Sequence, residues 1–102
     1  MTNDDLHPFL SVRFRSDARA YALARGGHVW IWGKPFGRSW LRMDADTAPP
    51  AEVEFSDEAE IDGVTVHTAP EMAMYASRHP AAIARNRWPR KRLSVTNPWY
   101  LG

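Results

Sequence analysis

The sequence predicts a strand-rich α+β domain, and three of its features support this prediction. Short alternations of apolar and polar residues recur, for example at Val12–Phe14 and Leu93–Val95, and a period of two is typical of half-buried strands. Helix-forming segments are few and short. The pair Asp62-Gly63 interrupts an alternating stretch and indicates a tight hairpin. We therefore expect about six or seven short strands with one or two short helices, arranged as a small sheet or sandwich.

The first half of the chain predicts a strand, a helix and a strand pair. Val12–Phe14 is followed by Ser16, a good N-cap for a helix that ends before the positive-φ pair Gly26-Gly27. His28–Trp32 is apolar on both faces, so we expect a central strand packed on two sides. Gly33–Arg38 then predicts a turn, and Ser39–Met43 a strand that pairs back.

The second half predicts further strands around a second helix. Val53 and Phe55 alternate with acids, which indicates a half-exposed strand. Thr68–Glu71 fits a capping box that starts a helix. Pro80–Arg87 is expected to form another short helical turn, and Leu93–Val95 the last strand.

The totals limit the class of protein. At 102 residues the chain is expected to form one domain over residues 11–102, preceded by a flexible arm over residues 1–10. No apolar run approaches the ~20 residues of a membrane span, and Met1–Phe9 lacks the apolar core of a signal peptide. The chain has no cysteine, which suits a reducing compartment, so we expect a cytoplasmic protein without membrane attachment.

Charge is strongly segregated although the net charge is only +1. Residues 44–71 contain nine acids and no base, whereas the residues after Glu71 contain six bases and no acid. Such blocks either pair with each other in the folded chain or leave a charged face exposed for a partner.

In the order of its elements the chain resembles the HesB-like family, the fold of the A-type iron–sulfur cluster carriers. Three stretches carry the likeness: the helix and strand over 16–32, the acidic strand with Ile-Asp-Gly-Val-Thr-Val and a helix start over 53–70, and the final Lys-Arg-Leu-Ser-Val-Thr-Asn-Pro over 91–98. Together they cover most of residues 12–98. The resemblance implies a single HesB-like domain.

The cluster ligands of that family are absent. Its carriers hold iron with a cysteine in the loop after the early strand and a Cys-Gly-Cys pair near the C-terminus. Here the loop is Gly33–Gly37 without a thiol, and the chain has no cysteine elsewhere. Without thiolates a conventional cluster cannot be ligated, so the resemblance implies a divergent, cysteine-less member.

No pattern supports catalysis or a resident metal. A zinc site from His28 and His67 with an acid from residues 52–62 is conceivable, but no ligand spacing supports it and an ordinary role is expected for each histidine. No nucleophile-elbow motif frames Ser39 or Ser94. We therefore assign no catalytic residue, no metal ligand and no cofactor, and we lean against an enzyme.

The residues expected to bind a partner are a basic segment and two aromatic residues near the end of the chain. They are Arg85, Arg87, Trp88, Arg90, Lys91, Arg92, Trp99 and Tyr100. The leading hypothesis is a non-catalytic binding or scaffold domain that acts through an interface with another protein or in a homodimer. The alternative is a nucleic-acid-binding module that uses residues 85–92, since Arg and Lys neutralise phosphates and an indole stacks on bases. A small enzyme of unknown class is the third hypothesis.

Overall fold

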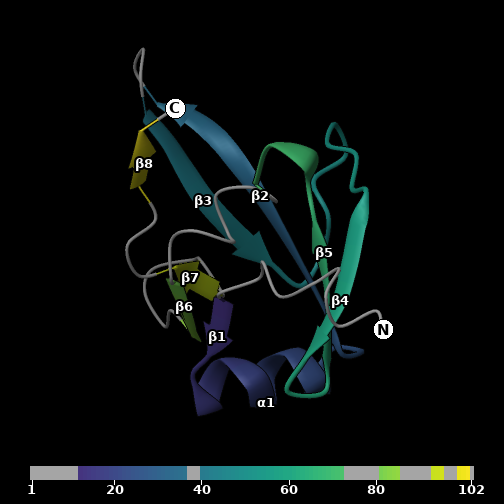
Figure 1. Ribbon diagram of the computed structural model, residues 1–102. Helices are drawn as coiled ribbons and strands as arrows, with labels where there is room; N and C mark the ends of the chain where they lie inside the picture. Colours follow the sequence, from purple (N-terminus) through teal and green to yellow (C-terminus); the bar gives the residue numbers. More distant parts are fainter. Residues whose placement is uncertain (1–11, 37–39, 73–80, 86–92, 96–98, 102) are drawn as a thin grey trace, which may run out of the picture.

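The computed structural model describes residues 12–36, 40–72, 81–85, 93–95 and 99–101, which excludes the expected N-terminal arm. In this part of the chain eight strands form two sheets, the helix α1 lies across their ends, and a helical turn begins at Pro70 (Figure 1). The elements are β1 (Val12–Phe14), α1 (Ser16–Ala24), β2 (His28–Phe36), β3 (Trp40–Asp46), β4 (Asp57–Ile61), β5 (Val64–Thr68), β6 (Ala81–Arg85), β7 (Leu93–Val95) and β8 (Trp99–Leu101). The predicted strand-rich α+β class is confirmed.

The larger sheet has five strands in the order β4-β5-β2-β3-β8. Two antiparallel hairpins, β2–β3 and β4–β5, are joined by the parallel pairing of β2 with β5, in which Val29 lies opposite Val66 and Ile31 opposite Thr68. The smaller sheet has the order β1-β6-β7, with β1 parallel to β6.

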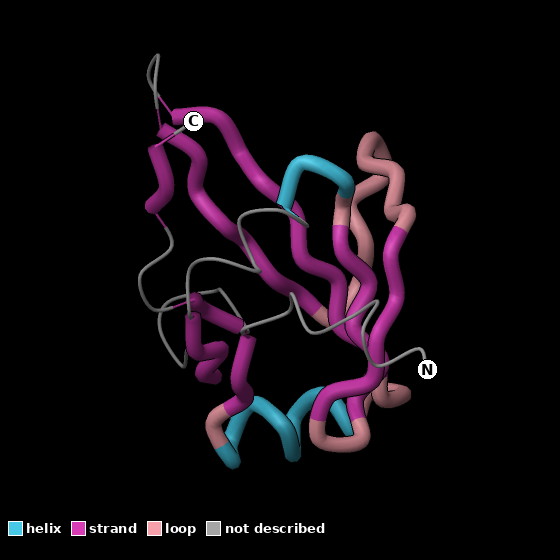
Figure 2. The backbone as a smooth tube through the Cα atoms, viewed as in Figure 1, coloured by secondary structure: helices cyan, strands magenta, loops and turns pink. Residues whose placement is uncertain are grey.

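The core lies on one face of the larger sheet. Burial alternates along β5, where Val64, Val66 and Thr68 are buried and the residues between them are half-buried. The smaller sheet and α1 close this face, and α1 crosses the end of both sheets (Figure 2). The buried cluster comprises Val12, Ala18, Ala22, Val29, Ile31, Met43, Ala45, Val64, Val66, Met72, Ile83 and Leu93.

The ends of α1 differ in how well they were predicted. Gly26 and Gly27 both have positive φ, at 107° and 82°, as expected for residues that end a helix. At the other end Ser16 is the first helical residue, and the N-cap is Arg15, which makes no side-chain capping bond. The prediction that Ser16 caps the helix was therefore wrong by one position.

Two predicted strand boundaries are corrected by the pairing. Residues 53–56 form no strand, because their opposite strand β5 ends at Thr68, which pairs with Asp57. β2 continues through the expected turn to Phe36. Its pairing with β5 stops at Ile31, so Pro35 lies where β2 needs no donor on that side.

The segment expected to be helical after Pro80 is the strand β6 over its described residues. β6 is held between β1 and β7, so hydrogen bonding on both sides overrides the helical preference of its alanines. The capping box expected at Thr68 is absent too. The Thr68 hydroxyl is buried and has no hydrogen-bond partner among the described residues, and the helical turn begins at Pro70.

His28–Trp32 is central in its sheet, as predicted, but it is not packed on two sides. Val29 and Ile31 are buried, whereas His28 is exposed and Trp30 and Trp32 are half-buried. The other face of this strand is therefore only partly buried. In the described part of the chain no helix has the length and hydropathy of a membrane span.

The hairpin at Asp62-Gly63 yields a stability prediction. Ile61 pairs with Val64, and the two turn residues have φ of 53° and 84°. Replacing Gly63 with Val should lower the free energy of unfolding by about 1–2 kcal/mol or more, because a β-branched residue resists positive φ. Chemical denaturation measures the loss. Gly63→Asn is the control and should cost less, since Asn tolerates this region; equal midpoints for Gly63→Val and the parent would contradict the turn geometry.

Candidate functional site

The open face of the five-stranded sheet gathers aromatic, histidine and acidic residues from four strands. In one row across the sheet Glu58 of β4 pairs with His67 of β5, His67 with Trp30 of β2, and Trp30 with Asp46 of β3. Cross-strand partners share a face of the sheet. We call this surface the outward face; it comprises His28, Trp30, Trp32, Asp44, Asp46, Glu58, Glu60, Thr65 and His67.

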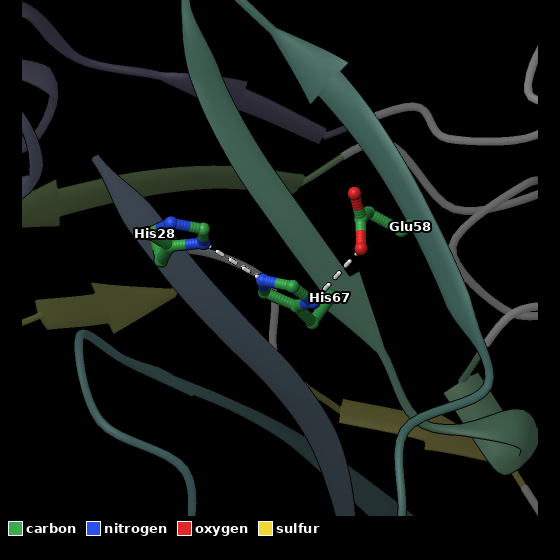
Figure 3. Close-up of polar contacts among 3 residues, drawn as sticks. All are labelled: His28, Glu58 and His67. Atoms are coloured by element: carbon green, nitrogen blue, oxygen red, sulfur yellow. Dashed lines mark hydrogen bonds and ion pairs between the residues drawn. The ribbon is translucent and has the colours of Figure 1, made fainter. Parts of the chain in front are cut away.

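His67 is the centre of the polar contacts on this face. Figure 3 shows its ring between His28 on one side and Glu58 on the other. Nε2 of His67 lies 2.9 Å from Nδ1 of His28, and Nδ1 of His67 lies 3.6 Å from Oε1 of Glu58. The indole of Trp30 runs nearly parallel to the His67 ring, at 13° and 4.8 Å between ring centres. The His67 side chain is 18% exposed.

The two imidazoles meet edge to edge. Their planes differ by 17°, so the rings are nearly coplanar, and the ring centres are 5.2 Å apart. This separation agrees with a direct contact of 2.9 Å between the two facing ring nitrogens. Only one hydrogen atom lies between Nδ1 of His28 and Nε2 of His67, because one nitrogen must donate and the other must accept. The two histidines therefore form one hydrogen-bonded pair across the parallel strands β2 and β5.

The surroundings of His67 disfavour its charged form. Partial burial lowers the pKa of His67, the carboxylate of Glu58 opposes this and His28 adds to it. In the neutral ring the negative charge of Glu58 favours the proton on Nδ1. Nε2 then accepts the Nδ1–H of His28, which leaves the lone pair of His28 Nε2 directed away from this contact, on an exposed residue.

The structure brings together the residues of the conceivable zinc site without forming one. His28, His67 and an acid of the 52–62 stretch, Glu58, do converge. The facing nitrogens of the two histidines are bonded to each other, however, and Glu58 lies on the far side of His67. Within the described ranges no group of three or more His, Asp or Glu side chains is arranged to hold a metal ion.

Charge on the outward face is acidic toward β4 and mixed toward β3. Glu58 and Glu60 are exposed on the edge strand β4. On β3 Asp44 pairs with Arg42 at 3.2 Å, and Asp46 accepts the amide of Thr47 at 2.7 Å. Trp30 therefore lies between carboxylates of strands on both sides.

The predicted partner-binding residues are only partly described. Arg85 ends β6, is exposed, and places its guanidinium 4.9 Å from the centre of the Tyr21 ring. Trp99 and Tyr100 lie in the edge strand β8, opposite Arg42 and Leu41. Arg87, Trp88, Arg90, Lys91 and Arg92 fall outside the described residues, so whether the basic block pairs with the acidic block or stays exposed for a partner is left as a prediction.

Comparison with known proteins adds a fold relation. No protein-family model matches the chain, and no curated protein matches it significantly in sequence. The crystal structure of IscA with the [2Fe-2S] cluster is similar over 85% of each chain, with a TM-score of 0.51 and 16% identity. This likeness supports the expected relation to the HesB-like fold, and at this identity it shows the fold alone.

The residues of this chain do not fit a cluster held by thiolates. The structural neighbour was solved with a [2Fe-2S] cluster, and such clusters are usually held by cysteine thiolates. This chain has no cysteine. On the outward face the facing ring nitrogens of His28 and His67 are hydrogen-bonded to each other.

The lowered pKa of His67 predicts how stability changes with pH. The unfolded chain binds a proton at this residue near pH 6.5, whereas the folded chain resists it, so the free energy of unfolding should fall as the pH drops below about 6.5. His67→Gln should flatten this part of the profile. Urea denaturation at about pH 7.5 and about pH 5.5 tests the difference between the two proteins. An NMR titration midpoint of His67 at or above 6.5 would contradict it.

Proposed function

We propose that this chain is a non-catalytic binding domain with an IscA-like fold, and that the outward face engages a protein partner. The observation that carries the proposal is the row Glu58–His67–Trp30–Asp46, which spans four strands on a face that neither α1 nor the smaller sheet covers. A half-buried indole surrounded by fixed polar groups is typical of the centre of a protein interface.

The chemistry of this face fits a partner segment rich in arginine or lysine. Glu58 and Glu60 supply carboxylates on one side of Trp30, and Asp46 supplies one on the other. Carboxylates attract cationic side chains, and an indole face binds a guanidinium by cation–π contact.

The edge of the sheet is less suited to a partner than its face. β4 is an edge strand whose sequence is Asp-Glu-Ala-Glu-Ile. Charged side chains along an edge discourage another strand from pairing there. The partner is therefore expected to lie over the side chains of the face and not to extend the sheet.

The proposal gives the fold a use other than carrying a thiolate-bound cluster. The absence of cysteine removes the usual cluster ligands, while the scaffold is retained. A cytosolic location is part of the proposal, since a binding domain without disulfides suits a reducing compartment. No group on the outward face is assigned a catalytic role.

A basic peptide probe tests the proposal. A fluorescein-labelled hexa-arginine peptide should bind the parent protein with micromolar affinity. Glu58→Gln with Glu60→Gln should weaken binding by about two- to tenfold, because each removes an exposed ionic contact worth up to about 1 kcal/mol. Trp30→Leu should weaken it by about two- to fivefold through loss of cation–π contact. Fluorescence anisotropy measures both effects.

The matched control removes the same charge elsewhere. Glu52→Gln with Glu54→Gln changes two exposed acids of the loop before β4, off the paired rows of the sheet. This variant should bind the peptide like the parent. Equal weakening in both double variants would show general attraction to acidic protein and overturn the proposal.

Light scattering of the chain alone adds a further test: self-association lost on Glu58→Gln with Glu60→Gln would identify a second copy as the partner.

A further inference from the structure

We infer that the end of the molecule formed by α1 and β6 binds the phosphate backbone of duplex nucleic acid. The surface is defined by Arg15, Tyr21, Arg25 and Arg85, and we call it the α1–β6 surface. Arg15, Tyr21 and Arg25 lie in or beside α1 and Arg85 ends β6 of the smaller sheet, so the surface shares no residue with the outward face and has the opposite charge. The inference goes beyond the proposed protein interface and does not depend on it.

Two guanidinium groups are held on one aromatic ring. The guanidinium carbon of Arg25 lies 4.6 Å from the centre of the Tyr21 ring, and that of Arg85 lies 4.9 Å from it. Each contact is a cation–π interaction, which restricts where the charge can lie. Among the described residues neither guanidinium forms an ion pair with a carboxylate. Two positive charges are thus held at one ring, and both arginines are exposed, so anionic groups at this surface are favoured.

The backbone brings a third arginine to the same end. The amide of Arg15 donates to the carbonyl of Ile83 at 2.9 Å, which fixes the start of α1 beside β6. Arg15, Arg25 and Arg85 are all exposed. The nearby acid, Asp17, accepts the backbone amide of Arg85 at 3.4 Å. The local balance of these four residues is two positive charges.

The chemistry favours duplex phosphates over single-stranded bases. Single-strand binders present aromatic faces on which bases stack, whereas the Tyr21 ring already carries contacts from two guanidiniums. Arginine offers planar donors that match phosphate oxygens. Contacts of this kind position a protein on the backbone and confer no sequence preference.

Binding of a labelled duplex of ~20 base pairs tests the inference by fluorescence anisotropy at several salt concentrations. We expect a Kd of about 1–100 µM near physiological salt, equal for two unrelated sequences. The logarithm of the association constant should fall with the logarithm of salt by about 0.9 for each phosphate neutralised. The corresponding single strand should bind more weakly. No binding at about 50 mM salt, or tighter binding of the single strand, would overturn the inference.

Single substitutions locate the contact. Arg25→Gln and Arg85→Gln should each make the salt slope less steep by about 1. Asp17→Asn should tighten binding, since it removes the local negative charge while its amide oxygen can still accept the Arg85 amide hydrogen. Lys34→Gln is the control: it removes one exposed positive charge from β2 and should leave the slope unchanged. Thermal melts verify that each variant is folded, and an equal loss in Lys34→Gln would overturn the assignment.

Discussion

The parallel pairing of β2 with β5 is the contact on which the rest of this structure depends. It joins the hairpins β2–β3 and β4–β5, which together with the edge strand β8 form one sheet of five strands. On one side it sets Val29 against Val66 in the core, and on the other it sets Trp30 beside His67. A shift of one residue in this register would exchange the two faces, so the same pairing that buries the core also builds the histidine pair.

The alternation of side chains along each strand separates core residues from polar surface residues. In β5 the residues that face the core are apolar or buried, while Thr65 and His67 between them face outward. The acids of the middle third of the sequence contribute to the outward face through β3 and β4. The described arginines at the ends of α1 and β6 lie on a different part of the molecule. Among the described residues, the acids of β3 and β4 and the arginines beside α1 and β6 therefore lie on different elements.

Features governed by neighbours in sequence were predictable, and those governed by distant partners were not. The positive φ of Gly26, Gly27 and Gly63 follows from local turn chemistry. The strand nature of Ala81–Arg85 depends on β1 and β7, which come from opposite ends of the chain. Local propensity alone favoured a helix there. Pairing partners set the extent of β4 and β2 in the same way.

The candidate site illustrates the same limit. His28 and His67 are separated by 39 positions and belong to strands that no short motif connects. Composition identified both histidines and the acidic stretch, but only the register of β2, β5 and β4 selects Glu58 from that stretch. For Arg85 the sequence indicated a charged residue available to a partner. Its packing on Tyr21 arises from the contact of β6 with α1.

The edge-to-edge contact of His28 and His67 also links the tautomers of the two rings. A single hydrogen bridges the rings, so a change of tautomer in one requires a change in the other. A hydrogen bond given to or taken from His28 at the surface is therefore transmitted through His67 to the carboxylate of Glu58 on the edge strand. The side chains of His28, His67 and Glu58 thus couple the surface at β2 to the edge strand β4 through polar contacts alone.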